Sequence, residues 1–310
     1  MKIGFLADLR NATPWERPGA AHYAEQLELI EEADRLGAWA IVLGEHHLTA
    51  DGYMPQPLVF GAAIAARTQH IRIGTEVLVA PFRHPLHIAE EVAVLDQLSA
   101  GRVELGLGAG YMQKEYDAFG EDRDARFRDL DATVLEVRRL LAEEVSPRPV
   151  QEEVPIWAGY NMPVGARRAG RLGVGLMSTL GWCLEPYLEG FREGGHDPAK
   201  ARMGGLTDLI VAEDPERARA MLWPHIEYQA GQYATYIGAA MGSGDPQSYK
   251  VLSPDEAIAH LRGMAEGLPL AFVTPWLSIG GMPIEAVREH VRLTMDVVAP
   301  AVADVGLQEG

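Results

Sequence analysis

Two hydrophobic periods alternate along the chain and divide it into eight strand-then-helix units. Each unit starts with a short apolar run and continues into a segment whose apolar residues recur three and four positions apart. The strand runs cover residues 2–9, 39–44, 71–79, 103–108, 154–158, 174–178, 206–212 and 270–273. Most are almost continuously apolar, which is typical of parallel strands covered on both faces. The pattern predicts an α/β fold, a (β/α)8 TIM barrel formed by one domain over residues 1–310.

The competing architecture is a doubly wound sheet, which usually carries a glycine-rich phosphate turn after its first strand. Residues 7–13 contain no glycine, so the barrel is favoured. An insertion around residues 223–250 breaks the rhythm, and it holds four of the ten tyrosines (Tyr228, Tyr233, Tyr236 and Tyr249). Long connections are often functional lids. The alternative is an extra helix packed by its aromatic side chains, and the sequence leaves both possibilities open.

Charge and cysteine content narrow the range of partners. The chain has 27 Lys and Arg against 44 Asp and Glu, a net charge of −17, which argues against a nucleic acid or an anionic membrane surface as partner. Cys183 is the single cysteine, so neither an intrachain disulfide nor a cysteine-built metal site is expected. No apolar run reaches membrane-spanning length, and the first residues do not look like a signal peptide. We expect a cytoplasmic protein acting on a small molecule.

Chemistry in a barrel belongs at the carboxyl ends of the strands. Glu45, His46 and His47 follow the second strand run, and a carboxylate beside two imidazoles suits acid–base catalysis. Successive strand residues point in opposite directions, so Glu45 and His46 should not both face the barrel axis. One histidine could instead cap a loop. A metal would need a third ligand such as His84 or His87, and because no His-Glu-x-x-His spacing exists, no metal is expected.

A gap in the acidic residues gives a second signal. Residues 154–184 contain no Asp or Glu but include Arg167, Arg168 and Arg171. The same window holds Asn161-Met162-Pro163, a plausible helix start, and a first turn without acids suits a bound anion such as phosphate. The alternative is chance combined with arginines on a solvated face. Residues 52–75 also lack acids, which shows that buried apolar structure produces such gaps too.

Four stretches make the chain recognisable. They are Val42-Leu-Gly-Glu-His-His-Leu48, Ile73-Gly-Thr-Glu-Val-Leu-Val-Ala-Pro81, Leu95-Asp-Gln-Leu-Ser-Ala-Gly-Arg102 and Glu104-Leu-Gly-Leu-Gly-Ala-Gly-Tyr111. With them the sequence resembles the bacterial luciferase-like monooxygenases, a flavin-dependent (β/α)8 family. The resemblance is dense over residues 1–180 and looser over 253–301.

The resemblance implies a flavin-dependent monooxygenase that uses reduced FMN, supplied by a partner flavin reductase, and molecular oxygen on a small organic substrate. His46 would be the active-site histidine beside the flavin, with Glu45 supporting its surroundings. Thr75, Glu76 and Val77 match a segment that often holds a non-prolyl cis peptide behind the flavin ring. The remaining implied cofactor contacts are Ala109, Gly110, Tyr111, Gly159, Tyr160, Asn161, Met162, Gly165 and Ser178, with residues 159–165 around the phosphate. Members of the family are commonly dimers, so a homodimer is expected.

Two departures from the family pattern bear on the cofactor. Gly108 and Ala109 stand where luciferase itself has a reactive cysteine and a phosphate-binding arginine, so one anion contact is lost. Tyr111 stands where deazaflavin-dependent relatives carry an acid, which favours an oxygenase. The alternatives are a deazaflavin-dependent hydride-transfer oxidoreductase and a non-catalytic flavin-binding protein.

Overall fold

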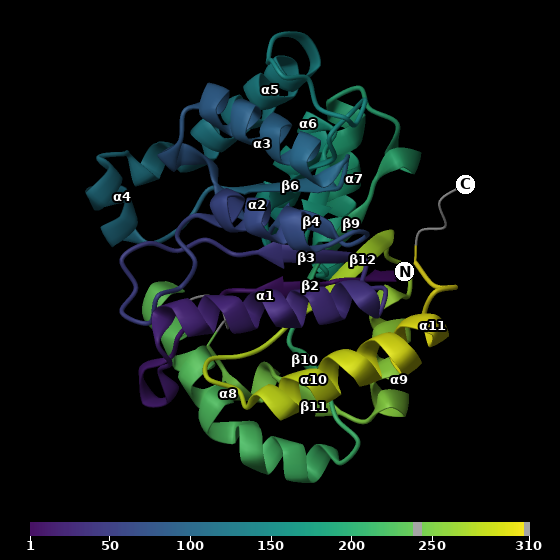
Figure 1. Ribbon diagram of the computed structural model, residues 1–310. Helices are drawn as coiled ribbons and strands as arrows, with labels where there is room; N and C mark the ends of the chain where they lie inside the picture. The colour runs from purple at the N-terminus through teal and green to yellow at the C-terminus, as the bar shows by residue number, and fades with distance from the viewer. Residues whose placement is uncertain (238–243, 307–310) are drawn as a thin grey trace.

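The strands form one parallel sheet that closes on itself as a barrel (Figure 1). The structure, a computed structural model, describes residues 1–237 and 244–306. The barrel strands are β1 (Lys2–Ile3), β2 (Phe5–Ala7), β3 (Ala40–Leu43), β4 (Arg72–Thr75), β5 (Leu78–Val79), β6 (Val103–Gly108), β7 (Ile156–Gly159), β8 (Gly175–Met177), β9 (Met203–Thr207) and β12 (Leu270–Pro275). Closure follows because β1 pairs with β12 while β2, just beyond Gly4, pairs with β3. The predicted barrel is confirmed.

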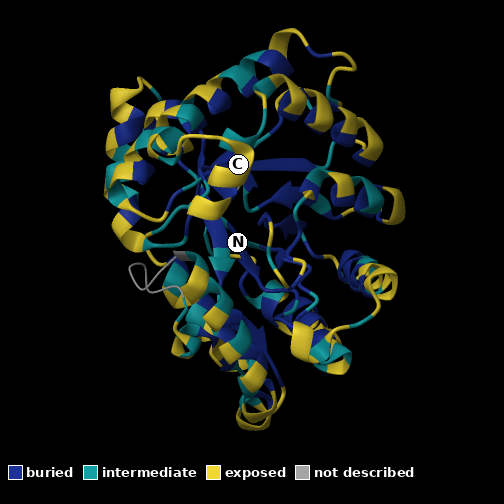
Figure 2. Cartoon of the chain, turned by 90° about the vertical axis from the view of Figure 1, so that its left-hand side faces the viewer, coloured by how far each residue is buried: buried dark blue, intermediate teal, exposed yellow. Residues whose placement is uncertain are grey.

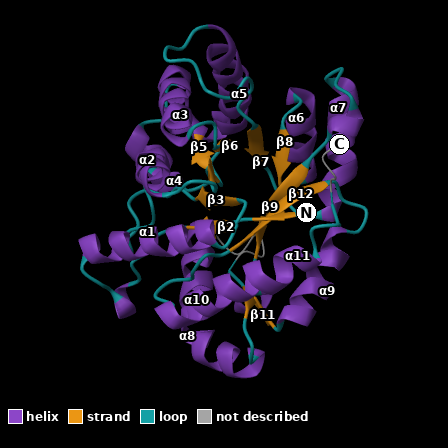
Figure 3. Cartoon of the chain, turned by 45° about the vertical axis from the view of Figure 1, so that its right-hand side comes forward, coloured by secondary structure: helices purple, strands orange, loops and turns teal. Residues whose placement is uncertain are grey.

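Helices surround the strands on the outside (Figure 3). They are α1 (Gly19–Arg35), α2 (Pro57–Arg67), α3 (Pro85–Ser99), α4 (Gln113–Phe119), α5 (Arg126–Glu143), α6 (Pro163–Leu172), α7 (Leu184–Glu193), α8 (Pro215–Ile237), α9 (Pro254–Ala265), α10 (Ile284–Leu293) and α11 (Ala299–Ala301). Figure 2 shows buried strands at the centre and exposed residues on the outward sides of the helices. Every residue of β3 and of β6 is buried, as parallel strands covered by helices should be. Within the described residues, no helix is both long and apolar enough to cross a membrane.

The seventh strand differs from the prediction. The barrel strand is β9, Met203–Thr207, and not residues 206–212. Residues Leu209–Val211 form β10, which leaves the barrel and pairs with β11 (Lys250–Leu252). The prediction was wrong because Gly204 and Gly205 interrupt the apolar run. A β-carbon on Gly204 would lie 2.8 Å from the Phe272 ring, so glycine is needed where this strand packs inside the barrel.

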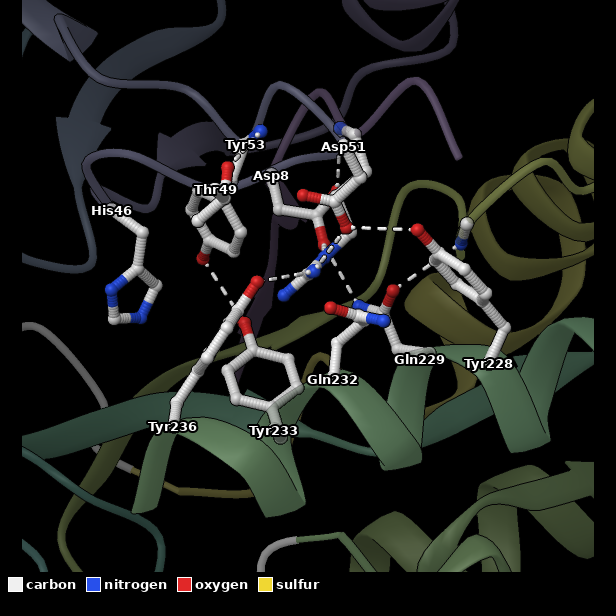
Figure 4. A network of polar contacts seen from close by, with 12 residues as sticks. Asp8, His46, Thr49, Asp51, Tyr53, Tyr228, Gln229, Gln232, Tyr233 and Tyr236 are labelled. Atoms are coloured by element: carbon white, nitrogen blue, oxygen red, sulfur yellow. Dashed lines mark hydrogen bonds and ion pairs between the residues drawn. The ribbon is translucent and has the colours of Figure 1, made fainter. Parts of the chain in front are cut away.

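The segment around residues 223–250 is helical over its first half. α8 runs to Ile237 and turns Tyr228, Gln229 and Tyr233 toward the end of β2 (Figure 4). Residues 238–243 of the predicted insertion lie outside the described residues. Of the two possibilities that the sequence left open, a lid or a helix packed by its aromatic side chains, the described part of the segment forms the helix.

The stretch Leu95–Arg102 has a structural role, joining α3 to β6. The Asp96 carboxylate accepts hydrogen bonds from the backbone N–H of Gln151 (2.9 Å) and of Val103 (3.4 Å). The Arg102 guanidinium donates to the carbonyls of Ala65, Thr68, Ile71 and Ser99. Ala100 and Gly101 both have positive φ, 54° and 85°, which makes the tight turn between helix and strand. The motif therefore fixes the turn at the start of β6, at the opposite end of this strand from Gly108.

Candidate active site

His46 lies at the centre of a hydrogen-bonded relay beyond the end of β3. Its Nδ1 is 3.0 Å from Glu115 Oε1, and its Nε2 is 2.7 Å from the Tyr111 hydroxyl. The same Glu115 oxygen accepts the backbone N–H of His47 at 2.7 Å. Because a carboxylate only accepts, neutral His46 carries its hydrogen on Nδ1, and Nε2 accepts from the Tyr111 O–H. The partners therefore fix one tautomer and one orientation of a ring that is only 5% exposed.

Glu45 points away from this relay and supports the neighbouring loop. Its Oε1 lies 2.6 Å from His47 Nε2, and its Oε2 accepts the Val79 backbone N–H at 2.8 Å. Arg83 donates to the same carboxylate. Glu45 and His46 thus have separate sets of partners, as expected, although both residues lie just beyond the end of β3. Glu45 fixes the segment after β4, whereas His46 faces the barrel mouth.

The cis peptide implied by the resemblance is present between Glu76 and Val77, directly after β4. The Thr75 hydroxyl donates to the Gly106 carbonyl at 2.7 Å and anchors the start of this segment. Val77 packs against two glycines, because added β-carbons on Gly108 and Gly159 would lie 2.2 and 2.7 Å from its methyl groups. These small residues let the Thr75–Val77 segment lie inside the barrel, where a flat ring could rest on it.

The Glu76 carboxylate is held inside the barrel by two donors. The backbone N–H of Leu206 and the Thr274 hydroxyl each donate to it at 2.7 Å. Burial raises the pKa of Glu76 to about 7, although these two hydrogen bonds act in the opposite direction. A carboxyl that titrates near neutrality therefore lies beside the cis peptide.

The loop after β6 brings Ala109, Gly110 and Tyr111 to the same mouth. Gly110 has φ 67°, and an added β-carbon would lie 2.7 Å from Val79. The buried Tyr116 hydroxyl donates to the Ala109 carbonyl and holds the loop from beneath. Burial also raises the pKa of Tyr111 well above its ordinary value, so its hydroxyl keeps its proton at neutral pH.

The start of α6 fits a phosphate group. Its N-cap residue, Met162, gives no side-chain cap, and its first turn contains no acid. Asn161 and Met162 are exposed, whereas Tyr160 is buried, and an added β-carbon on Gly165 would lie 2.3 Å from the Tyr160 ring. Free backbone N–H groups and the positive end of a helix bind phosphate well. Ser178, at the end of β8, is buried and accepts the Leu180 N–H at 3.3 Å.

The arginines of the acid-free window do not contribute to this anion site. Arg167 and Arg171 donate to Glu193 on α7, and Arg168 pairs with Asp131 at 2.7 Å. The expectation that these arginines help to bind an anion was wrong, because their side chains form ion pairs with acidic residues of neighbouring helices. His84 likewise caps α3, accepting the Leu86 N–H at 3.2 Å. The described residues contain no group of three or more His, Cys, Asp and Glu side chains arranged to hold a metal.

A buried ionic cluster beside His46 was missed by the sequence analysis. Arg10 donates to Asp8 (2.8 Å) and to Asp51 (2.6 Å), and all three side chains are almost fully buried. Gln229 of α8 donates to Asp8 at 2.8 Å, so the cluster ties α8 to the end of β2 (Figure 4). In the sequence, the charged pair Asp8-x-Arg10 directly after the first strand could have indicated this cluster. Its partners come from distant segments, so only the folded chain reveals the cluster.

Comparison with known proteins places the chain in a family. The sequence profile described as luciferase-like monooxygenase matches residues 1–271. Limonene 1,2-monooxygenase from Rhodococcus erythropolis is 32% identical over 237 residues, which cover 67% of this chain and 61% of the relative. F420-dependent glucose-6-phosphate dehydrogenase from Amycolatopsis mediterranei is 26% identical over 311 residues, covering 93% and 88% of the two chains. For three curated relatives, the match spans 66%, 61% and 44% of the relative's length.

A solved structure agrees with these sequence matches. The monooxygenase RslO1 from Streptomyces bottropensis superposes with a TM-score of 0.83 at 28% identity, covering 97% of this chain and 99% of that one. The barrel and the profile match point to the same assignment. The chain belongs to the luciferase-like monooxygenase family.

Proposed function

We propose that this protein is a flavin-dependent monooxygenase that binds reduced FMN from a separate flavin reductase and uses molecular oxygen to oxidise a small organic substrate. The observation that carries the proposal is the Tyr111–His46–Glu115 relay, with Nε2–O and Nδ1–O distances of 2.7 and 3.0 Å. It puts a neutral phenol at the position where the deazaflavin-dependent relatives carry an acid. Similarity to monooxygenases at 28% and 32% identity supports the same proposal.

The residues have separate tasks in this proposal. The first turn of α6 would bind the FMN phosphate, and the Thr75–Val77 segment would support the ring. FMN, when bound, supplies the redox chemistry with oxygen. His46 donates a hydrogen bond from Nδ1 to Glu115 and accepts one at Nε2 from the Tyr111 hydroxyl. The Tyr111 hydroxyl can therefore pass its proton to His46 while it takes a proton from a reacting group. Tyr53 and Tyr233, whose ring centroids lie 4.8 and 6.4 Å from that of His46, exclude water from one side of the relay.

A second candidate is a deazaflavin-dependent hydride-transfer oxidoreductase. The F420-dependent glucose-6-phosphate dehydrogenase matches 93% of the chain, a larger share than the limonene enzyme does. This candidate also needs an acid–base group, but it needs no oxygen.

The two candidates are separated by titrating the purified protein with FMN and with a deazaflavin and following tryptophan fluorescence. The proposal expects tighter binding of FMN. It also expects His46→Ala to retain flavin binding while losing oxygen-dependent turnover, with His84→Ala, a helix-cap histidine, as the matched control. Tighter deazaflavin binding, or full turnover by His46→Ala, would refute the proposal.

A further inference from the structure

The buried cluster at the end of β2 contains two polar atoms without partners. Among residues 1–237 and 244–306, Arg10 Nη2 and Asp51 Oδ1 are buried and have no hydrogen-bond partner. The other nitrogens of Arg10 are engaged, since Nε donates to Asp8 and Nη1 donates to Asp51 and, at 3.0 Å, to the Tyr236 hydroxyl. A buried donor that makes no hydrogen bond carries a free-energy cost. Arg10 therefore has hydrogen-bonding capacity that the described residues leave unused.

Aromatic side chains occupy the region between this cluster and His46. The Arg10 guanidinium carbon lies 4.6, 5.0 and 5.3 Å from the ring centroids of Tyr53, Tyr233 and Tyr236. The centroids of two of these rings, Tyr53 and Tyr236, also lie 4.8 and 4.9 Å from that of His46. Such walls favour a flat ring over a flexible chain.

The Tyr236 side chain is itself a phenol bound in this space. Its hydroxyl accepts from Arg10 Nη1, its ring lies against His46, and its centroid is 5.8 Å from that of Tyr233. Burial raises the pKa of Tyr236, so the phenol is uncharged at neutral pH. Tyr236 is only half-buried and lies in the last turn of α8, whereas Arg10 is fully enclosed. The chain therefore shows which ligand chemistry this space accepts.

The charge of the cluster selects against anions. Two carboxylates, Asp8 and Asp51, surround one guanidinium, so the cluster carries a formal charge of −1. Bringing a third carboxylate into a buried site of that charge is unfavourable. A neutral oxygen that accepts a hydrogen bond from Arg10 meets no such penalty.

We propose that the Tyr236 ring occupies the substrate position, and that the substrate is an uncharged ring compound whose hydroxyl or carbonyl oxygen accepts a hydrogen bond from Arg10 after displacing Tyr236. The site so defined adjoins His46, and the assignment of its ligand as substrate rests on the proposed function. Arg10 is then a specificity-determining residue, and Tyr53 and Tyr233 form the walls for the ring.

The test removes the Tyr236 side chain and measures the binding of added phenol. Tyr236→Ala removes a side chain that ends in a phenol ring, so free phenol is the matching probe. Benzene tests the ring without its hydroxyl group, and benzoate tests a ring that carries a negative charge. Isothermal titration calorimetry should give at least about tenfold tighter phenol binding to Tyr236→Ala than to the wild type, with phenol also at least about tenfold tighter than benzene. Tyr23→Ala, which removes an exposed tyrosine elsewhere, is the matched control and should bind phenol as the wild type does.

Second variants test the two polar partners in the Tyr236→Ala background. Arg10→Met should reduce phenol affinity to that of benzene. Should Arg10→Met fail to fold by circular dichroism, Asp51→Asn gives an independent result, because it brings the cluster charge to zero and should narrow the preference for phenol over benzoate by at least about fivefold. Equal binding of phenol and benzene, tighter binding of benzoate than of phenol, or no gain from Tyr236→Ala would overturn the proposal. Phenol binding needs no cofactor, so this test is independent of the FMN titration.

Discussion

Replacing Glu76 by Gln should make the stability of the protein less dependent on pH. Glu76 has an ordinary pKa of 4.5 in the unfolded chain and about 7 in the folded protein, because burial disfavours its charged form. Below pH 4.5 the carboxyl is protonated in both the folded and the unfolded state, so its ionisation does not change the free energy of unfolding. Between 4.5 and 7 only the unfolded chain loses the proton, so the folded state becomes less stable as the pH rises. Above pH 7 the cost is constant, at about 3 kcal/mol.

The neutral amide can keep both hydrogen bonds of Glu76. Its oxygen can accept the Leu206 N–H, and its NH2 group can donate to the Thr274 hydroxyl, so Glu76→Gln removes the charge with little change in packing. Relative to the wild type, the variant should therefore gain about 2.5 kcal/mol between pH 5 and pH 8. With an unfolding entropy of about 2.1 cal/mol/K per residue over 310 residues, this gain is a relative rise of about 4 °C in Tm.

Differential scanning calorimetry of the cofactor-free protein at pH 5 and pH 8 measures the effect. Glu227→Gln, on the exposed side of α8, is the matched control and should follow the wild type at both pH values. If Tm of Glu76→Gln and Tm of the wild type differ by the same amount at pH 5 and pH 8, the reasoning about this carboxyl is refuted.

Three further substitutions test the packing and the relay. Tyr111→Phe keeps the aromatic ring but removes the hydrogen bond to His46 Nε2, and it should lower kcat by about 10²-fold. A wild-type rate in steady-state assays would exclude Tyr111 from proton transfer. Glu115→Ala leaves His46 Nδ1 and the buried His47 N–H without an acceptor, and it should lower the free energy of unfolding in urea by about 2–4 kcal/mol. Glu115→Gln should recover at least half of this loss. Equal losses of unfolding free energy in the two variants would show that the acceptor is unimportant. Gly108→Ala places a β-carbon 2.2 Å from Val77 and should lower both Tm and FMN affinity. Gly181→Ala, whose β-carbon meets nothing within 4 Å, should lower neither. If Gly108→Ala has the Tm and FMN affinity of the wild type, Val77 can shift without cost.

The barrel could be predicted from the sequence because its signal is repeated. Eight apolar runs followed by helical periods leave little choice of architecture, and a single misplaced strand at Gly204 and Gly205 does not alter it. The motif Leu95–Arg102 is specific because its turn requires Asp96 and Arg102 at fixed positions. Local patterns therefore carried the fold.

The site was only partly predictable, because its groups come from distant segments. Alternation along the strand predicted separate directions for Glu45 and His46, but nothing local indicated that Glu115 would reach both His46 and His47. Apart from Asp8, the acceptors of Arg10 lie at position 51 and on α8, at sequence separations of 41 and 226 residues. The arginines of the acid-free window misled for a related reason, since their acidic partners lie on α5 and α7, outside the window.

The most direct test of the proposed oxygenation uses molecular oxygen labelled with 18O. The protein, with FMN and a flavin reductase, is supplied with uncharged ring compounds that carry a hydroxyl or carbonyl oxygen, and the products are analysed by mass spectrometry. The account predicts one 18O atom in each product molecule and no product without oxygen. Formation of an unlabelled product in the absence of oxygen, with a deazaflavin as the hydride carrier, would contradict it.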